Sequence, residues 1–215
     1  HQMQQYCAWW KDGKYSSTGD CFDIGGQTRS ALERFQRTQN PFAGSTAAAH
    51  AGNGSLMRLA PIAIFYHCSL SNTIMYAAES SRTTHGTIAC VDACKVFSAM
   101  LHHAIEGHNK QAVLASADFL LPDTSKLIAE IVAGSYRQKK RMQINSSGYV
   151  VHTLEAALWC FYHSQSLEEA ILLAANLGDD SDTVAAVTGQ IAGAFYGADA
   201  IPAAGMDTLY HADKL

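Results

Sequence analysis

The chain has 215 residues, of which 48% are hydrophobic and 16% charged. This composition suits one globular domain over residues 1–215 and excludes the disordered and fibrous classes. The formal net charge is −4, and the one basic run lies at residues 137–141. A single short run of this kind is typical of a solvated helix end, so the charge pattern argues against nucleic acid as a partner.

The cysteines and the apolar runs bear on where the protein works. The six cysteines contain no CxxC pair, which predicts free thiols and a cytoplasmic location. No run of about eighteen uninterrupted apolar residues occurs, and the first residues lack the layout of a signal peptide, so we expect no membrane partner. Because the chain starts with His1 and not with Met, we interpret it as beginning part-way through a longer protein.

Apolar residues recur at three- and four-residue steps along most of the chain, which predicts helices. The predicted helices span residues 27–37, 55–66, 71–80, 86–106, 125–135, 149–163, 166–176 and 181–196, with loops at 14–26, 38–54 and 138–148. Pro61 predicts that the second helix starts near it or is kinked there. No segment shows the sustained alternation of a strand. We therefore expect an all-α fold, a single compact multi-helix domain with eight or nine helices.

The last long predicted helix carries glycines at a regular spacing. Gly189, Gly193 and Gly197 are four residues apart, and each costs a helix about 1 kcal/mol relative to alanine. This cost predicts that another helix backbone packs closely against the glycine face.

The first candidate site is the acidic run GDDSDT at residues 178–183. Asp180 and Asp182 are separated by one residue and followed by Thr183, so a turn there could aim two carboxylates and a hydroxyl at one point. Such hard oxygen ligands suit magnesium, manganese or calcium. The alternative is helix capping, in which acidic residues accept backbone amides at a helix N-terminus. The residues alone leave both interpretations open.

Three further segments could contact a ligand, and each has a plain structural alternative. Residues 52–54, Gly-Asn-Gly, permit a close backbone approach, but Asn-Gly is also a common turn. His85 could contact a phosphate or a ribose, or cap the helix that follows. Residues 147–149, Ser-Gly-Tyr, precede a predicted helix and could bind an anion or simply cap that helix.

Taken in chain order, four motifs together resemble the ADP-ribosylglycohydrolase family, which is related to the dinitrogenase-reductase-activating glycohydrolase. They are GNGSLMRLAPIAI, SSRTTHG followed by VDAC, SGYVVHTLEAALW, and NLGDDSDTVAAVTGQIAGAFYG. The resemblance runs from about residue 16 to about residue 200, and its last motif is the most specific. It implies an all-α fold, a pair of divalent cations that are usually magnesium (manganese is possible), and cleavage of the glycosidic bond between ADP-ribose and a side chain or small molecule.

The resemblance also assigns residues to roles by position. The metal ligands would be Asp180, Asp182 and Thr183, whereas Asp179 stands where many relatives have glycine and receives no role. The residues along ADP-ribose would be Gly52, Asn53, Gly54, His85, Ser147, Gly148 and Tyr149. Met57 and Arg58 match the first motif as well, and Arg58 could equally be structural.

The family pattern also has a first half that these 215 residues lack. Members begin with a glycine-rich helix carrying an acidic residue, followed by a Thr-Asp-Asp-Thr-type element. These two elements supply the remaining metal ligands. Because the catalytic residues are also expected in this segment, we assign none of them here. Without those acids two divalent ions would be bound weakly, so we expect activity to be lost in the chain as given. Apolar faces uncovered by the absent helices would favour association with another chain.

Two other functions remain open. A catalytically degenerate module could bind ADP-ribose or a protein partner without cleaving anything. A purely structural helical domain would require all four ordered motifs to be coincidental.

Overall fold

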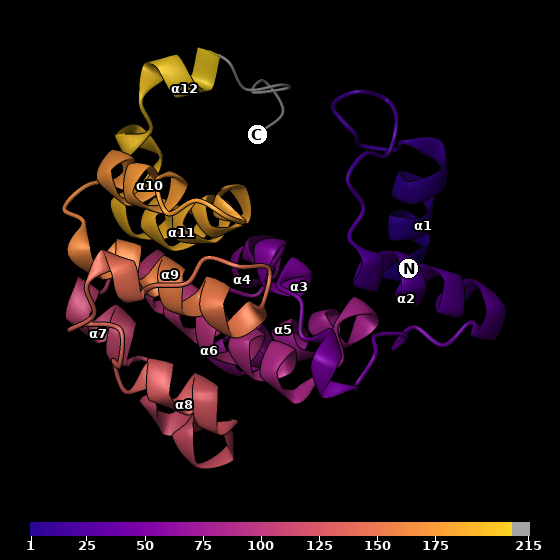
Figure 1. The fold of residues 1–215 in the computed structure, drawn as a ribbon, viewed down its shortest axis with the longest axis horizontal. Helices are drawn as coiled ribbons and strands as arrows, with labels where there is room; N and C mark the ends of the chain where they lie inside the picture. The colour runs from indigo at the N-terminus through magenta and orange to yellow at the C-terminus, as the bar shows by residue number, and fades with distance from the viewer. Residues whose placement is uncertain (208–215) are drawn as a thin grey trace.

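A computed structural model describes residues 1–207 of the chain, and Figure 1 shows their arrangement. The α-helices are α1 (Gln2–Asp12), α2 (Gly26–Thr38), α3 (Gly54–Met57), α4 (Ala60–Phe65), α5 (Leu70–Thr84), α6 (Ile88–Ile105), α7 (Lys110–Ala115), α8 (Lys126–Val132), α9 (Val150–His163), α10 (Leu167–Ala175), α11 (Ser181–Tyr196) and α12 (Ala203–Asp207). Short 3-10 helices lie at Ala48–His50, Asp118–Asp123, Arg141–Gln143 and Ala198–Ala200. The described residues form no sheet and only two isolated β-bridges, so the all-α prediction is confirmed.

Each of the eight predicted helices appears in the structure, but one of them is divided. Residues 55–66 form α3 and α4, and Pro61 lies at the start of α4, where its missing N–H costs nothing. The sequence did not predict α1, α7 or α12. α1 buries only Met3, and α7 and α12 are six and five residues long, so none of the three shows a sustained apolar periodicity.

α6 forms the centre of the main core. Its side chains Val96, Phe97 and Met100 are completely buried, and α5, α9, α11 and α4 all pack against it. α5 and α9 lie on either side of α6 in Figure 1, with α10 and α11 beyond α9. Thr87 begins α6 as an N-cap, since its hydroxyl accepts the backbone N–H of Cys90. The helix predicted over residues 86–106 is therefore confirmed, although Ile88, expected on its buried face, is 72% exposed.

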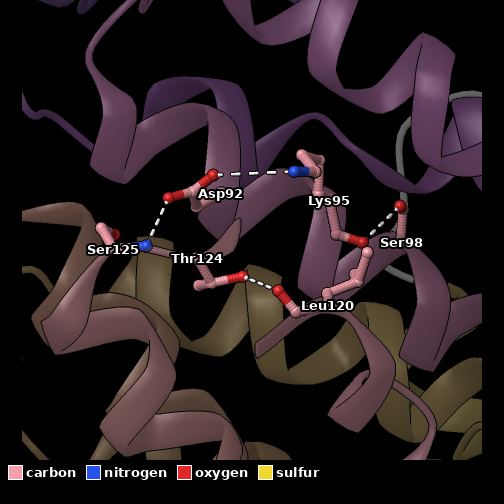
Figure 2. Close-up of polar contacts among 6 residues, drawn as sticks. All are labelled: Asp92, Lys95, Ser98, Leu120, Thr124 and Ser125. Carbon is pink, nitrogen blue, oxygen red and sulfur yellow. Dashed lines mark hydrogen bonds and ion pairs between the residues drawn. The ribbon is translucent and has the colours of Figure 1, made fainter. Parts of the chain in front are cut away.

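A buried carboxylate fixes α8 against α6. Asp92 of α6 is 5% exposed, and its Oδ2 accepts the backbone N–H of Ser125 at 2.8 Å, immediately before α8 begins. Its other oxygen lies 3.9 Å from the ammonium of Lys95. Figure 2 shows these contacts together with the bond from the Thr124 hydroxyl to the Leu120 carbonyl, which closes the preceding turn. Asp92 thus has a structural role, because it holds the start of α8 against α6.

α1 and α2 form a second, smaller hydrophobic cluster. Met3, Leu32 and Phe35 belong to it, and it is separate from the core around α6. In Figure 1 this pair lies to one side of the molecule, with α3 between it and α11. Arg58, directly after α3, joins the two parts because its guanidinium donates to the hydroxyl of Tyr6 in α1 and to backbone and hydroxyl oxygens of α5.

The prediction that a helix backbone packs against the glycine face of α11 is wrong. A Cβ atom placed on Gly189, Gly193 or Gly197 would meet no atom within 4 Å outside the helix's own backbone. Gly197 ends the helix with a φ of 84°, a conformation that glycine adopts without strain. The first two glycines therefore lie on an open stretch of α11, and close packing does not explain them.

Within the described residues, α6 is long and apolar enough by length and composition to cross a bilayer, but 67% of the segment is buried inside the fold. Such burial is typical of a core helix.

Candidate functional site

Two loops meet beside the N-terminus of α9. The backbone of Gly52 forms an antiparallel bridge with Tyr149. The N–H of Asn53 donates to the carbonyl of Gly148 at 3.1 Å, and the N–H of Val150 donates to the carbonyl of Ala51 at 2.9 Å. These bonds place residues 52–54 and 147–149 side by side, as two of the three weaker motifs would require if they served one ligand.

The acidic turn is attached to the same place. Gly178 and Asp179 both have positive φ, at 83° and 53°, which turns the chain sharply before α11. The Ser146 hydroxyl donates to the carbonyl of Gly178 at 2.8 Å, and the N–H of Asp180 donates to the carbonyl of Ser146 at 3.0 Å. The turn therefore brings the Asp180 carboxylate close to residues 147–149.

The Asp180 carboxylate accepts two side-chain hydrogen bonds. Its Oδ2 accepts from Nδ2 of Asn53 at 2.6 Å, and its Oδ1 accepts from the Thr183 hydroxyl at 2.9 Å. Asp180 stands at the N-cap position of α11, yet its side chain accepts no backbone amide there. The capping alternative therefore does not account for Asp180.

The Asn53 side chain connects the acidic turn to α9. Its Nδ2 also donates to the hydroxyl of Thr153 at 2.8 Å, so both hydrogens of the amide are used and its Oδ1 accepts no hydrogen bond within the described residues. Thr153 is completely buried in the first turn of α9. Thr153 lies within the motif SGYVVHTLEAALW, but no local sequence pattern signals its contact with a residue 100 positions away.

His85 lies beneath the glycine turn. It is 3% exposed, and its Nδ1 is 2.8 Å from the Thr84 hydroxyl. Burial, with a smaller contribution from the positive charge of Arg58, lowers the pKa of His85 to about 3. The ring is therefore neutral at physiological pH, and a ligand contact, if it makes one, would be a hydrogen bond and not a charge.

The remaining predicted residues divide between the site and its surroundings. Ser147 hydrogen-bonds Nδ1 of His152 at 2.8 Å, and the Tyr149 ring packs edge-on against the same imidazole. Asp182 is exposed in the first turn of α11, where the helix dipole favours an acid. The described residues show no hydrogen bond or ion pair to its carboxylate. The structure therefore brings Asp180 and Thr183 together but gives Asp182 no contact with them.

The oxygen atoms at this point fit part of a magnesium site. The Asp180 carboxylate and the Thr183 hydroxyl are hard donors in contact with each other, which are the ligands that magnesium prefers. Among the described residues no group of three or more His, Cys, Asp and Glu side chains is placed to hold a metal ion. The donors present are thus suitable in kind and incomplete in number, and the ligand roles of Asp180, Asp182 and Thr183 stay predictions.

The contact between the glycine turn and His85 gives a testable expectation. A Cβ atom on Gly54 would lie 2.9 Å from Cε1 of the buried His85 ring, so we expect Gly54→Ala to lower the free energy of unfolding by roughly 1–3 kcal/mol. Gly189→Ala is the matched control, because a Cβ there meets open space and should raise that free energy by up to about 1 kcal/mol. Urea denaturation of both variants measures the two signs, and an unchanged Gly54→Ala would contradict the close contact.

Comparison with known proteins identifies the family to which the chain belongs. The family model described as ADP-ribosylglycohydrolase matches residues 1–215. A solved structure titled "ADP-ribosylglycohydrolase-related protein complex" superimposes with a TM-score of 0.86 at 37% identity, covering 99% of this chain and 69% of that chain. The chain belongs to the ADP-ribosylglycohydrolase family, and the resemblance deduced from its motifs is confirmed.

Three individual relatives show how similar the chain is to named members of this family. ADP-ribosylarginine hydrolase Tri1 of Pseudomonas putida (strain GB-1) is 47% identical over 194 residues, which is 90% of this chain and 52% of that protein. The protein of the same name from Serratia proteamaculans (strain 568) is 41% identical over 96% of this chain and 56% of its own length. ADP-ribosyl-[dinitrogen reductase] glycohydrolase of Rhodospirillum rubrum is 27% identical over 87% of this chain and 60% of its own length. The chain thus spans a little more than half the length of these relatives.

Proposed function

We propose that this chain provides a large part of an enzyme that hydrolyses the bond between ADP-ribose and the arginine side chain of a modified protein. The arginine linkage is suggested by the two relatives above 40% identity, both named ADP-ribosylarginine hydrolase. The observation that carries the proposal is the hydrogen bond from Asn53 to Asp180. It joins the first and last family motifs at the loop that holds residues 147–149.

In this proposal the chain's own residues bind and orient the substrate. Gly52 and Gly54 let the turn pack directly on the His85 ring, because a Cβ on Gly54 would lie 2.9 Å from Cε1 of that ring, and the backbone of residues 52–54 would lie along ADP-ribose. Asn53 holds the Asp180 carboxylate in one orientation through its amide, and its free Oδ1 can accept a hydrogen bond from a ribose hydroxyl. His85 supports the turn from below as a neutral ring, so it adds no charge near the pyrophosphate.

We also propose a dependence on magnesium, with manganese as a possible substitute. The resemblance implies two ions in the complete family site, and Asp180, Asp182 and Thr183 would hold them from this chain. When bound, the ions would supply positive charge that orients ribose hydroxyls and stabilises charge developing at the cleaved bond. The two aspartates neutralise only half of the four positive charges of such an ion pair, so we expect this chain alone to bind the ions weakly.

The assay is release of ADP-ribose from a protein modified on arginine, with a protein modified on serine as the comparison. We expect magnesium-dependent release from arginine when the chain is extended toward the N-terminus to the length of its relatives. ADP-ribose binding without release by the extended chain would favour the catalytically degenerate module. Release from serine but not from arginine would refute the proposed linkage.

The cysteines and the charge pattern support the cellular location and the partner that we propose. All six cysteines are free, which supports a reducing cytoplasm as the place of action. The basic run is partly used inside the protein, since Lys139 pairs with Glu155 at 2.6 Å and Arg141 donates to the carbonyl of Asn176. An ADP-ribosylated protein is therefore a better candidate partner than nucleic acid.

A further inference from the structure

His152 lies in the first turn of α9, directly after the loop of residues 147–149, at a position to which the family motifs assign no role. Its Nδ1 is 2.8 Å from the Ser147 hydroxyl. Its half-buried imidazole meets the Tyr149 ring edge-on, with 5.1 Å between the ring centroids and 82° between the planes. His152 is therefore held by a hydrogen bond and by an aromatic contact, both to residues that we place along ADP-ribose.

The Ser147 hydroxyl is only partly used by these contacts. It has one hydrogen and two lone pairs, and one lone pair accepts the backbone N–H of Tyr149 at 3.4 Å. The contact with His152 uses either the hydrogen, donated to Nδ1, or the second lone pair, which then accepts from Nδ1. Within the described residues neither the hydroxyl nor Nε2 of His152 has a further hydrogen bond to a side chain or to the backbone. The pair therefore keeps unused polar atoms whichever way the shared hydrogen points.

Either arrangement leaves the Ser147–His152 pair with one donor and one acceptor. In a neutral imidazole one nitrogen donates and the other accepts. If Ser147 donates to Nδ1, then Nε2 carries the ring hydrogen and the second lone pair of the Ser147 oxygen can accept. If Nδ1 donates, the Ser147 hydrogen points outward and Nε2 can accept. A change of imidazole tautomer thus exchanges the two roles, so the pair can bind a ligand that offers one acceptor and one donor in either order.

The surroundings of this pair favour an uncharged planar group. Phosphates are bound best by cations, yet among residues 1–207 no lysine or arginine forms a hydrogen bond, an ion pair or a cation–π contact with Ser147, Tyr149 or His152. The Tyr149 ring is half-buried and has His152 as its aromatic partner in that range, so a flat group can stack on it. Adenine is the planar heteroaromatic part of ADP-ribose, and its edge carries ring-nitrogen acceptors and an amino donor. The base therefore fits this pair better than the pyrophosphate does.

We propose that His152 is a further substrate-binding residue: together with Ser147 it binds the edge of adenine, while the base stacks on Tyr149. The inference rests on the proposed function, because it takes the ligand to be ADP-ribose. Selectivity for the base belongs to His152 and Ser147, whereas Asn53 and Asp180 serve the ribose whose bond is cleaved. His152 is thus a specificity-determining residue that has no role in the cleavage step.

The test compares AMP with ribose 5-phosphate, which lacks the base, by calorimetric titration of the full chain. His152→Phe keeps a ring beside Tyr149 but removes both nitrogens, so we expect AMP binding to weaken roughly 3- to 10-fold, as the loss of one hydrogen bond implies. Binding of ribose 5-phosphate should change less than about twofold, because it makes no such bond. His163→Phe, at the exposed opposite end of α9, is the matched control and should leave both affinities unchanged. Equal weakening of both ligands by His152→Phe, weakening of neither, or a wild type that binds AMP no tighter than ribose 5-phosphate would overturn the inference.

A second measurement separates this inference from the proposed function. The imidazole nitrogen signals of His152, identified by their loss in His152→Phe, should move in a nitrogen–proton NMR spectrum when AMP is added, because a bound base selects one tautomer. Ribose 5-phosphate should leave them in place. Signals that do not move with AMP refute the adenine subsite, even if ADP-ribose is released from modified arginine. If the signals move with AMP but the N-terminally extended chain releases no ADP-ribose, the proposed function fails and the adenine subsite stands.

Discussion

Asp180→Asn should weaken magnesium-dependent binding of ADP-ribose by roughly 10- to 100-fold, the range seen when groups supporting a metal site are removed. The substitution removes the negative charge but keeps the shape of the side chain. An amide can still accept a hydrogen bond from Asn53 and pair with the Thr183 hydroxyl, so the turn before α11 should stay folded. Calorimetric titration at a fixed magnesium concentration measures the effect, and the thermal unfolding midpoint checks the fold.

Asp179→Asn is the control for this experiment. It makes the same chemical change one residue earlier, at an exposed position with a φ of 53° that asparagine also tolerates. We expect an affinity change of less than about twofold, because we assign Asp179 no ligand role. Asp182→Asn then tests the second proposed ligand. If Asp179→Asn weakens binding as much as Asp180→Asn does, a diffuse acidic field and not a specific ligand is responsible.

Acid should destabilise the protein through His85. The pKa of this residue is about 3 in the folded protein, and a histidine in the unfolded chain titrates near 6.5. Below pH 6.5 the unfolded chain therefore takes up a proton that the folded chain refuses, so the stabilisation is complete above pH 6.5 and is lost as the pH falls toward 3. We expect His85 to lower the free energy of unfolding by about 1.4 kcal/mol per pH unit in this range.

The His85 contribution is measured by urea denaturation between pH 7 and pH 4.5, compared with His85→Gln. The variant should lose stability less steeply than the wild type, although it is less stable at pH 7 because the ring contacts under Gly52 and Gly54 are gone. His163→Gln, at an exposed position in the last turn of α9, should keep the wild-type slope. Parallel curves for the wild type and His85→Gln would show that the imidazole is accessible to protons.

Much of the fold could be predicted from apolar periodicity, because burial of one helix face is what creates that pattern. α6 and α9 each bury most of their length, and their bounds were close to those expected. α1 was missed because it buries one residue and is otherwise half-exposed. The glycines of α11 were misjudged because the sequence gives the cost of a glycine but not what surrounds it.

The site was predictable as a set of segments and not as a geometry. The ordered motifs indicated residues 52–54, 147–149 and 180–183, and the structure brings the first two segments together with Asp180 and Thr183 but not with Asp182. Sequence spacing did not reveal that the Asp180 carboxylate accepts hydrogen bonds from both Asn53 and Thr183. It also did not reveal that Thr153 accepts the other hydrogen of the Asn53 amide. Such orientations depend on contacts between residues 100 and 127 positions apart, which no local pattern encodes.

The Asn53 side chain links three parts of the chain that are far apart in sequence. Thr153 is 100 residues away and Asp180 is 127 residues away. Contacts of such separation form only after long loops have closed, so the site should be absent from early folding intermediates. A ligand bound at Asn53 would oppose unfolding of the whole chain and not of one helix, by about 2.7 kcal/mol at a hundred times its dissociation constant. Hydrogen exchange in helices distant from the ligand would then slow together with exchange at the site.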